Sequence, residues 1–145
     1  IFTQRAMHLV VDATGYIPAG SDLTTIVPAR LLETRAGEPT FDTQQQNIGA
    51  RTAAQTTTVQ ITGRANIPTG ATAAIINITA ITPTNTGFIT AYPCDQPRPG
   101  ASTLNHDTAQ AIANGATIKL SAQGTICIFT QRAMHLVVDA TGYIP

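Results

Sequence analysis

Hydrophobic and polar residues alternate over several short stretches of the chain, which is the pattern of half-buried β-strands. In the clearest stretch, the even positions of 74–80 are Ala and Ile, while Asn77 and Thr79 stand on the opposite face. The same two-residue period recurs at 58–62, 117–120 and 134–139. No stretch keeps helical spacing for three turns, so the pattern predicts an all-β fold.

Residues that form turns separate the alternating stretches and suggest the architecture. Pro, Gly and Asn gather at 67–70, 82–87, 97–100, 114–115 and 123–124. Roughly seven to ten short strands then fit into the chain, which favours an antiparallel β-sandwich resembling a jelly roll. The residues expected to form its core are Val59, Ile61, Ile76, Ile78, Phe88, Ile118, Leu120, Ile126, Met134, Leu136 and Val138.

An exact repeat sets the domain organisation. Residues Ile1–Pro18 recur without change as Ile128–Pro145, at an offset of 127 residues. This identity predicts one period of a tandem array plus an 18-residue overlap. A period of 127 residues is too long for a solenoid coil of about 20–50 residues, so each repeat is expected to be one domain. We therefore assign 1–18 to the terminal strand segment of a preceding repeat and 19–145 to one complete β-sandwich repeat.

The repeated segment also suggests how neighbouring repeats are joined. Ile128–Pro145 follows Cys127 without an obvious turn, and its apolar face is expected to complete the sheet of its own domain. Since two identical strands cannot fill one position, the other copy would pair with a neighbouring sheet by strand complementation, giving a stiff array able to carry tension. Alternatively, 1–18 is the tail of a neighbouring domain and contributes nothing to assembly. The residues assigned to the inter-domain strand are Ile1, Met7, Leu9, Val11, Met134, Leu136 and Val138.

Composition narrows the class of protein. Charged residues make up 11% of the chain, against about 25% in typical domains. Lys+Arg and Asp+Glu number 8 each, which argues against a nucleic-acid-binding protein. No apolar run approaches the roughly 20 residues that cross a membrane, and the first residues lack a signal-peptide pattern. Threonine is abundant, at 25 of 145 residues, and a Thr-rich surface with few charges suits a secreted β-protein of the cell surface.

Four ordered motifs resemble a known module. The stretch 26–35, IVPARLLETR, resembles the VPxRLLDTR signature of a repeat module in secreted actinobacterial and related bacterial surface proteins. The stretches 74–79, 87–94 and 136–145 match the same module in order. The resemblance implies an exported β-domain that occurs in tandem or beside cell-wall enzymes, with no known activity of its own. Glu33 stands where the module's signature has Asp.

Two cysteines, Cys94 and Cys127, lie 33 residues apart at predicted strand ends. A metal site would need further ligands, and the chain has no CxxC or HxxxH spacing, so neither a metal nor a cofactor is expected. A cysteine nucleophile would need a nearby His and carboxylate or amide, which sequence alone does not place. An even count in an exported chain favours a disulfide between them.

Arg30, Glu33 and Arg35 form the densest group of charges in the chain. One interpretation is a loop that binds an acidic sugar. The favoured interpretation is a structural polar network, in which the guanidinium groups bind carbonyls and Asp139 from the last strand.

Three classes of function follow. The first is a structural repeat of an extracellular filament, stalk or surface coat, whose partners are identical neighbouring repeats or subunits. The second is a module that binds carbohydrate or cell-wall polysaccharide, although aromatic residues are only 5% of the chain and Trp is absent. An enzyme is not expected, because no grouping of acid, base and nucleophile is evident. The aromatic residues that a sugar site would use are Tyr16, Phe41, Phe88, Tyr92 and Phe129.

Overall fold

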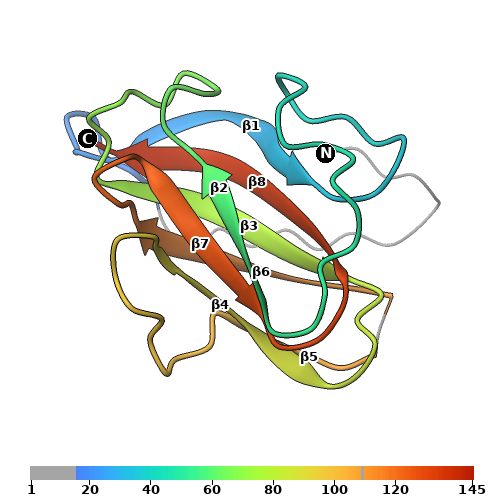
Figure 1. The fold of residues 1–145 in the computed structure, drawn as a ribbon. Helices are drawn as coiled ribbons and strands as arrows, with labels where there is room; N and C mark the ends of the chain where they lie inside the picture. The colour runs from blue at the N-terminus through green and yellow to red at the C-terminus, as the bar shows by residue number, and fades with distance from the viewer. Residues whose placement is uncertain (1–15, 109) are drawn as a thin grey trace.

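Two antiparallel sheets of four strands each account for the regular structure of residues 16–108 and 110–145, the part of the chain that the computed structural model describes (Figure 1). One sheet has the order β1-β8-β3-β6 and the other the order β2-β7-β4-β5. Their apolar faces pack together, which confirms the expected all-β sandwich. The strands are β1 (Thr24–Glu33), β2 (Gln55–Gln60), β3 (Ala73–Ile81), β4 (Gly87–Pro93), β5 (Leu104–His106), β6 (Ala111–Lys119), β7 (Thr125–Thr130) and β8 (His135–Ile144).

The strand pairing is nested. The first strand pairs with the last, β2 pairs with β7, β3 with β6, and β4 with β5, all antiparallel. The chain therefore follows one long antiparallel hairpin, with the β4–β5 connection at its tip, folded over so that successive pairs alternate between sheets. This is the arrangement of a jelly roll.

The interior is built mainly from aliphatic side chains on the inward faces of the strands. In β3 the alternation predicted from sequence is complete, because Ala74, Ile76, Ile78 and Ala80 are all buried. The other predicted core residues are also buried, except Phe88 and Ile118, which are half-buried. Buried positions that the pattern did not single out include Leu31, Leu32, Ile67, Ile89, Leu104 and Ile128.

The assignment of Phe88 to the core is wrong because β4 has apolar residues on both of its faces. Its neighbour Ile89 points inward and is fully buried. Phe88 lies on the outer face of the sheet against Phe129, with the ring centroids 6.0 Å apart. Ile118 is half-buried for a different reason, since it lies on the edge strand β6, which has a neighbouring strand on one side only.

The segment Ile128–Pro145 is two strands and not one. Ile128 belongs to β7, whereas β8 lies in the opposite sheet between β1 and β3, so residues 131–134 carry the chain from one sheet to the other. The segment follows Cys127 without a turn, as expected, but the expectation that it forms a single strand is wrong. Met134 lies just before β8, and Leu136 and Val138 are within it; all three are buried in the sandwich of their own chain. The copied positions Ile1, Met7, Leu9 and Val11 lie outside the described residues.

Candidate functional site

The described chain enters and leaves the sandwich at the same end. Thr24, the first residue of β1, is the cross-strand partner of Tyr143 near the end of β8. The backbone N–H of Thr72 donates to the carbonyl of Ile144 at 2.8 Å, which fixes the last strand in place. Figure 1 shows the C-terminus beside the blue segment that leads into β1. We call this end, marked by Thr24 and Tyr143, the junction end.

An exposed apolar pocket of about 330 Å³ lies at the junction end. It forms where β1 bulges away from β8, since the strand pairing is interrupted between Thr25 and Ala29. Val27 on the bulge is 87% exposed, and Phe41, which also lines the pocket, is 62% exposed. The residues that line the pocket are Thr24, Thr25, Ile26, Val27, Pro28, Ala29, Phe41, Ala65, Asn66 and Tyr143.

The four charged residues assigned to a polar network lie together at the other end of β1. The carboxylate of Glu33 is fully buried and accepts hydrogen bonds from Arg35 Nε at 3.0 Å and Nη2 at 2.8 Å. Arg30 donates from Nη1 to the same carboxylate at 3.0 Å and from Nε to Asp139 of the neighbouring strand at 2.9 Å. Each arginine is about one-third exposed, so the network reaches from the interior to the surface.

Electrostatics within this network favour the charged carboxylate. Burial by itself would raise the pKa of Glu33, but hydrogen bonds and positive charge from Arg35, with the charge of Arg30, outweigh burial and hold the pKa below its ordinary value. The hydrogen bond with Glu33 correspondingly raises the pKa of Arg35. A carboxylate saturated by two arginines has little capacity left to bind a ligand.

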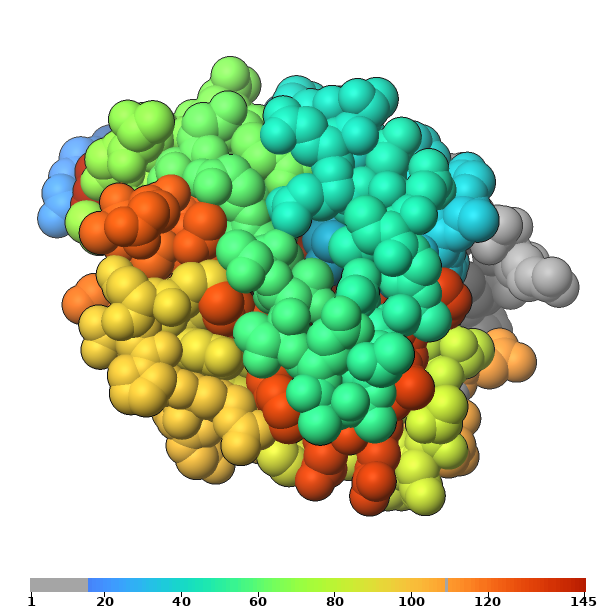
Figure 2. Space-filling model, viewed as in Figure 1, coloured from blue at the N-terminus to red at the C-terminus, as the bar shows by residue number. Residues whose placement is uncertain are grey.

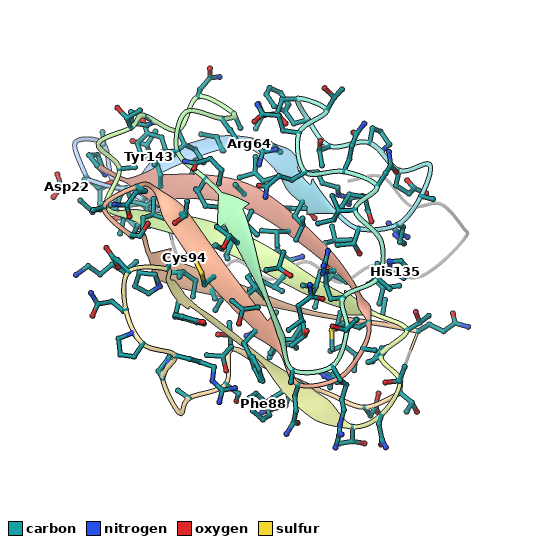
Figure 3. All side chains as sticks on the ribbon, viewed as in Figure 1. Asp22, Arg64, Phe88, Cys94, His135 and Tyr143 are labelled. Atoms are coloured by element: carbon teal, nitrogen blue, oxygen red, sulfur yellow. A yellow bond between two sulfur atoms is a disulfide. The ribbon has the colours of Figure 1, made fainter. Side chains whose placement is uncertain are left out.

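A second arginine centre, at Arg64, was missed by the sequence reasoning. Arg64 is 4% exposed and donates to Asp42 from Nε at 2.8 Å and Nη2 at 2.7 Å (Figure 3). Its Nη1 also donates to the carbonyls of Leu31 and Gln60, at 2.8 and 3.0 Å. The pKa of Asp42 is lowered, chiefly by the hydrogen bond with Arg64. No sequence signal marks this residue, because a single arginine after a turn looks like an ordinary surface charge.

These arginines fasten the long loop 34–54 to the sandwich. In Figure 2 this loop, coloured cyan to green, spreads over the part of the visible face beside β2. Backbone hydrogen bonds join Phe41 to Arg30 and Gln45 to Glu33 along the outer edge of β1. The side chain of Gln45 bonds the backbone of Thr58 and Gln60 along the outer edge of β2. The loop therefore covers the end of the β1 edge and the end of the β2 edge.

The predicted disulfide is confirmed. Cys94 follows β4 and is bonded to Cys127 of the adjacent strand β7, with the two Cα atoms 4.9 Å apart. It joins two neighbouring strands of one sheet and does not cross the core (Figure 3).

Each histidine of the described part has its Nδ1 near an oxygen atom, and the buried Nε2 of His106 has no hydrogen-bond partner among the described residues. His135 Nδ1 lies 3.0 Å from the hydroxyl of Thr34, and that hydroxyl also accepts the N–H of Leu136 at 2.9 Å. His106 is buried, with its Nδ1 3.3 Å from the carbonyl of Asp107.

Within residues 16–108 and 110–145, no group of three His, Cys, Asp or Glu side chains is placed to hold a metal ion. The same residues contain no helix long and apolar enough to cross a membrane.

Of the five aromatic residues proposed for a sugar site, Phe88 and Tyr92 of β4 and Phe129 of β7 lie on the outer face of one sheet, and the other two lie elsewhere. Phe88 and Phe129 lie side by side on the outer face of one sheet, inclined by 39°, and the guanidinium of Arg98 lies 3.9 Å from the centroid of the Phe129 ring. Phe41 belongs to the pocket at the junction end, and Tyr16 is 88% exposed ahead of β1.

A search against protein-family models and against curated proteins found no match for this chain.

Proposed function

We propose that the chain is a structural repeat from an array of jelly-roll domains, forming an extracellular filament, stalk or surface coat. The observation that carries this proposal is the identity of residues 1–18 and 128–145, because the copy places a second β8 sequence directly ahead of β1. The charged groups at Glu33 and Arg64 are engaged in internal ion pairs, which suits a domain whose polar residues maintain its shape. The disulfide is compatible with an extracellular location.

In the proposed array, the connection between neighbouring domains follows from the repeated sequence. Residue 17 corresponds to Ile144 at the end of β8, so residues 18–23 alone would join the β8 of one repeat to the β1 of the next. Residues 18–21 form a turn in which the N–H of Ser21 donates to the carbonyl of Pro18. The chain can therefore span no more than about 20 Å between the two domains.

In the proposed array, a connection this short would bring a neighbouring domain beside the pocket. Each sandwich receives and releases the chain at its junction end. The junction ends of successive domains would therefore lie in a row, and the body of each domain would extend sideways from that row. Val27 and Phe41 would then contact the adjacent repeat, and that contact would cover apolar side chains that are exposed in a single domain. Tension along such an array would peel β1 from β8 starting at the Thr24–Tyr143 pair, instead of shearing the whole ladder at once.

Strand complementation is the proposed means by which separate chains join. The slot between β1 and β3 is filled by the chain's own C-terminal β8, and residues 8–17 of another chain carry the same sequence. Refolding at high protein concentration would allow one chain's copy to enter another chain's slot. We expect the full chain to form open-ended oligomers and a chain of residues 19–145 to form none beyond a dimer. The same size distribution for both, measured by sedimentation velocity, would exclude strand complementation.

A carbohydrate-binding module is the second candidate, supported by the adjacent Phe88 and Phe129 rings. Electron microscopy of a chain of several repeats, combined with pull-down on cell-wall polysaccharide, separates the two functions. Uniform fibres without polysaccharide binding support the structural role. Dispersed single domains that bind polysaccharide, with binding lost in Phe129→Ala, would contradict the structural role and support the carbohydrate-binding module.

A further inference from the structure

We propose that the outer edge of β6 is an interaction surface for the β6 strand of a second copy, which pairs with it antiparallel and joins two sheets into one. This edge lies at the opposite side of its sheet from β1. The surface is separate from the junction end, so this pairing and the joining of successive repeats can succeed or fail independently.

The backbone groups along this edge have no partner among the described residues. The N–H of Leu120 donates to Thr72 and the N–H of Thr82 donates to Gln110, so the even-numbered residues of this segment face β3. In an antiparallel pair the hydrogen-bonding direction alternates from residue to residue. The odd-numbered residues 111–119 therefore direct their N–H and C=O groups away from β3, and all five residues are exposed.

The other sheet edges in the described part of the chain are protected, each by a different device. The loop 34–54 covers β1 from Arg30 to Glu33 and β2 from Thr58 to Gln60, and the first half of β1 bulges between Thr25 and Ala29. The outer strand β5 is only three residues long. By contrast, β6 extends for nine residues without a proline, and its one charged residue is Lys119 at the end. Long uncharged edges of this kind are templates for pairing with another strand.

The sequence of β6 is complementary to itself. In an antiparallel pair centred on Gly115, residue 111 faces residue 119 of the second copy, and all nine residues find partners. The half-buried Ile112 and Ile118 then face each other across the pair, twice by symmetry. Each Lys119 faces an alanine, so like charges do not meet. The five outward-facing residues of each strand form five pairs, which exchange about ten hydrogen bonds.

Chain direction argues against the chain's own N-terminal segment as the occupant. A segment that continues into β1 at Thr24 must run toward the junction end, and β6 also runs toward that end, since Lys119 pairs with Ala73 and Ala73 pairs with Ile144. The segment would therefore lie parallel to β6, whereas the rest of this sheet is antiparallel. A second copy can pair antiparallel, which is the more stable arrangement per residue.

Site-specific crosslinking of the full chain tests the register. In the proposed pair the two Gly115 Cα atoms lie about 5.5 Å apart, within the range that a disulfide spans. A Cβ at Gly115 meets no close atom in the monomer, so Gly115→Cys should fold normally. The matched control is Ala111→Cys, whose two copies would lie about 27 Å apart. We expect mild oxidation to give disulfide-linked dimers of Gly115→Cys and none of Ala111→Cys. Equal crosslinking of both variants, or of neither, overturns the proposal.

A proline variant identifies the occupant. Ala113→Pro removes an N–H that faces away from β3, so the monomer should keep its melting temperature while the dimer is lost. Ala113→Val keeps that N–H and should keep the dimer. Sedimentation equilibrium of both variants, with and without residues 1–18, provides the readout. A dimer that survives Ala113→Pro, or one that disappears on deleting residues 1–18, would show that the edge is not paired with β6 of a second copy.

Discussion

The guanidinium of Arg64 and the carboxylate of Asp42 form two parallel hydrogen bonds of 2.8 and 2.7 Å, although 21 residues separate them in the sequence. This ion pair holds the loop 34–54 against β1 and β2, and Arg64 is almost completely buried. The stability of the fold depends on both partners of such a pair. Removing one of them leaves buried polar groups without hydrogen bonds.

Replacing Arg64 by Ala should therefore reduce the free energy of unfolding by about 3–5 kcal/mol. Arg51 provides the control, since it is only partly buried and bonds Gln55 and a loop carbonyl. Arg51→Ala should cost less than about 1 kcal/mol. Urea unfolding of both variants measures the difference. Similar losses of unfolding free energy for the two variants would show that the contacts of Arg64 do not stabilise the fold more than those of Arg51.

Acid should weaken the fold in a defined range of pH. The pKa values of Glu33 and Asp42 are lowered in the folded protein from ordinary values of 4.5 and 3.8. A group whose pKa is lowered by folding contributes stability above its unfolded pKa and loses it as the pH falls through its folded pKa. The free energy of unfolding should be nearly constant from pH 7 to about 5.5 and decline below about pH 4.5. An unfolding midpoint that increases on acidification from pH 5 to pH 3 would contradict this.

The corrected orientation of β4 predicts unequal effects of two core-type substitutions. Ile78 is fully buried, so Ile78→Ala should cost about 2–5 kcal/mol. Phe88 is half-buried on the outer face, so Phe88→Ala should cost less, despite the larger volume that it removes. Thermal or denaturant unfolding of the two variants measures the difference. A greater loss of unfolding free energy for Phe88→Ala than for Ile78→Ala would contradict the placement of Phe88 outside the core.

Removing the disulfide should destabilise the domain without changing its fold. The Cys94–Cys127 bond spans 33 residues, for which the chain-entropy model gives about 3–4 kcal/mol. Cys94→Ala together with Cys127→Ala should lower the melting temperature and preserve the β-sheet circular dichroism spectrum. Thiol titration of the unfolded, unreduced wild-type chain should find no free sulfhydryl, whereas two would contradict the bond.

Sequence reasoning predicted the sandwich because β3 alternates between buried and half-buried residues along its whole length, and β8 does so from Val138 to Tyr143. It misplaced Phe88 because Phe88, Ile89 and Ala91 put apolar side chains on both faces of β4, and periodicity then has no preferred direction. It joined β7 to β8 because Gln131 and Arg132 do not form a recognisable turn sequence.

Polar contacts were predictable where the partners are few or close in sequence, and in one distant case, the pairing of Asp139 with Arg30 of β1. The two cysteines permit a single intramolecular pairing, and Glu33 lies within three residues of both Arg30 and Arg35. Arg64 is different, because its partners come from β1, β2 and the loop 34–54, which only the folded chain brings together.

The spacing of domains in a chain of several repeats tests the central claim most directly. If each sandwich receives and releases the chain beside the Thr24–Tyr143 pair, the connecting residues 18–23 limit the rise per repeat to about 30 Å or less. Domains linked end to end would be spaced by more than the roughly 33 Å length of a ten-residue strand, and loops would extend this further. Electron microscopy of a multi-repeat chain should show side-projecting domains at the shorter spacing. A row of domains spaced about 40 Å apart along their long axes would contradict the account.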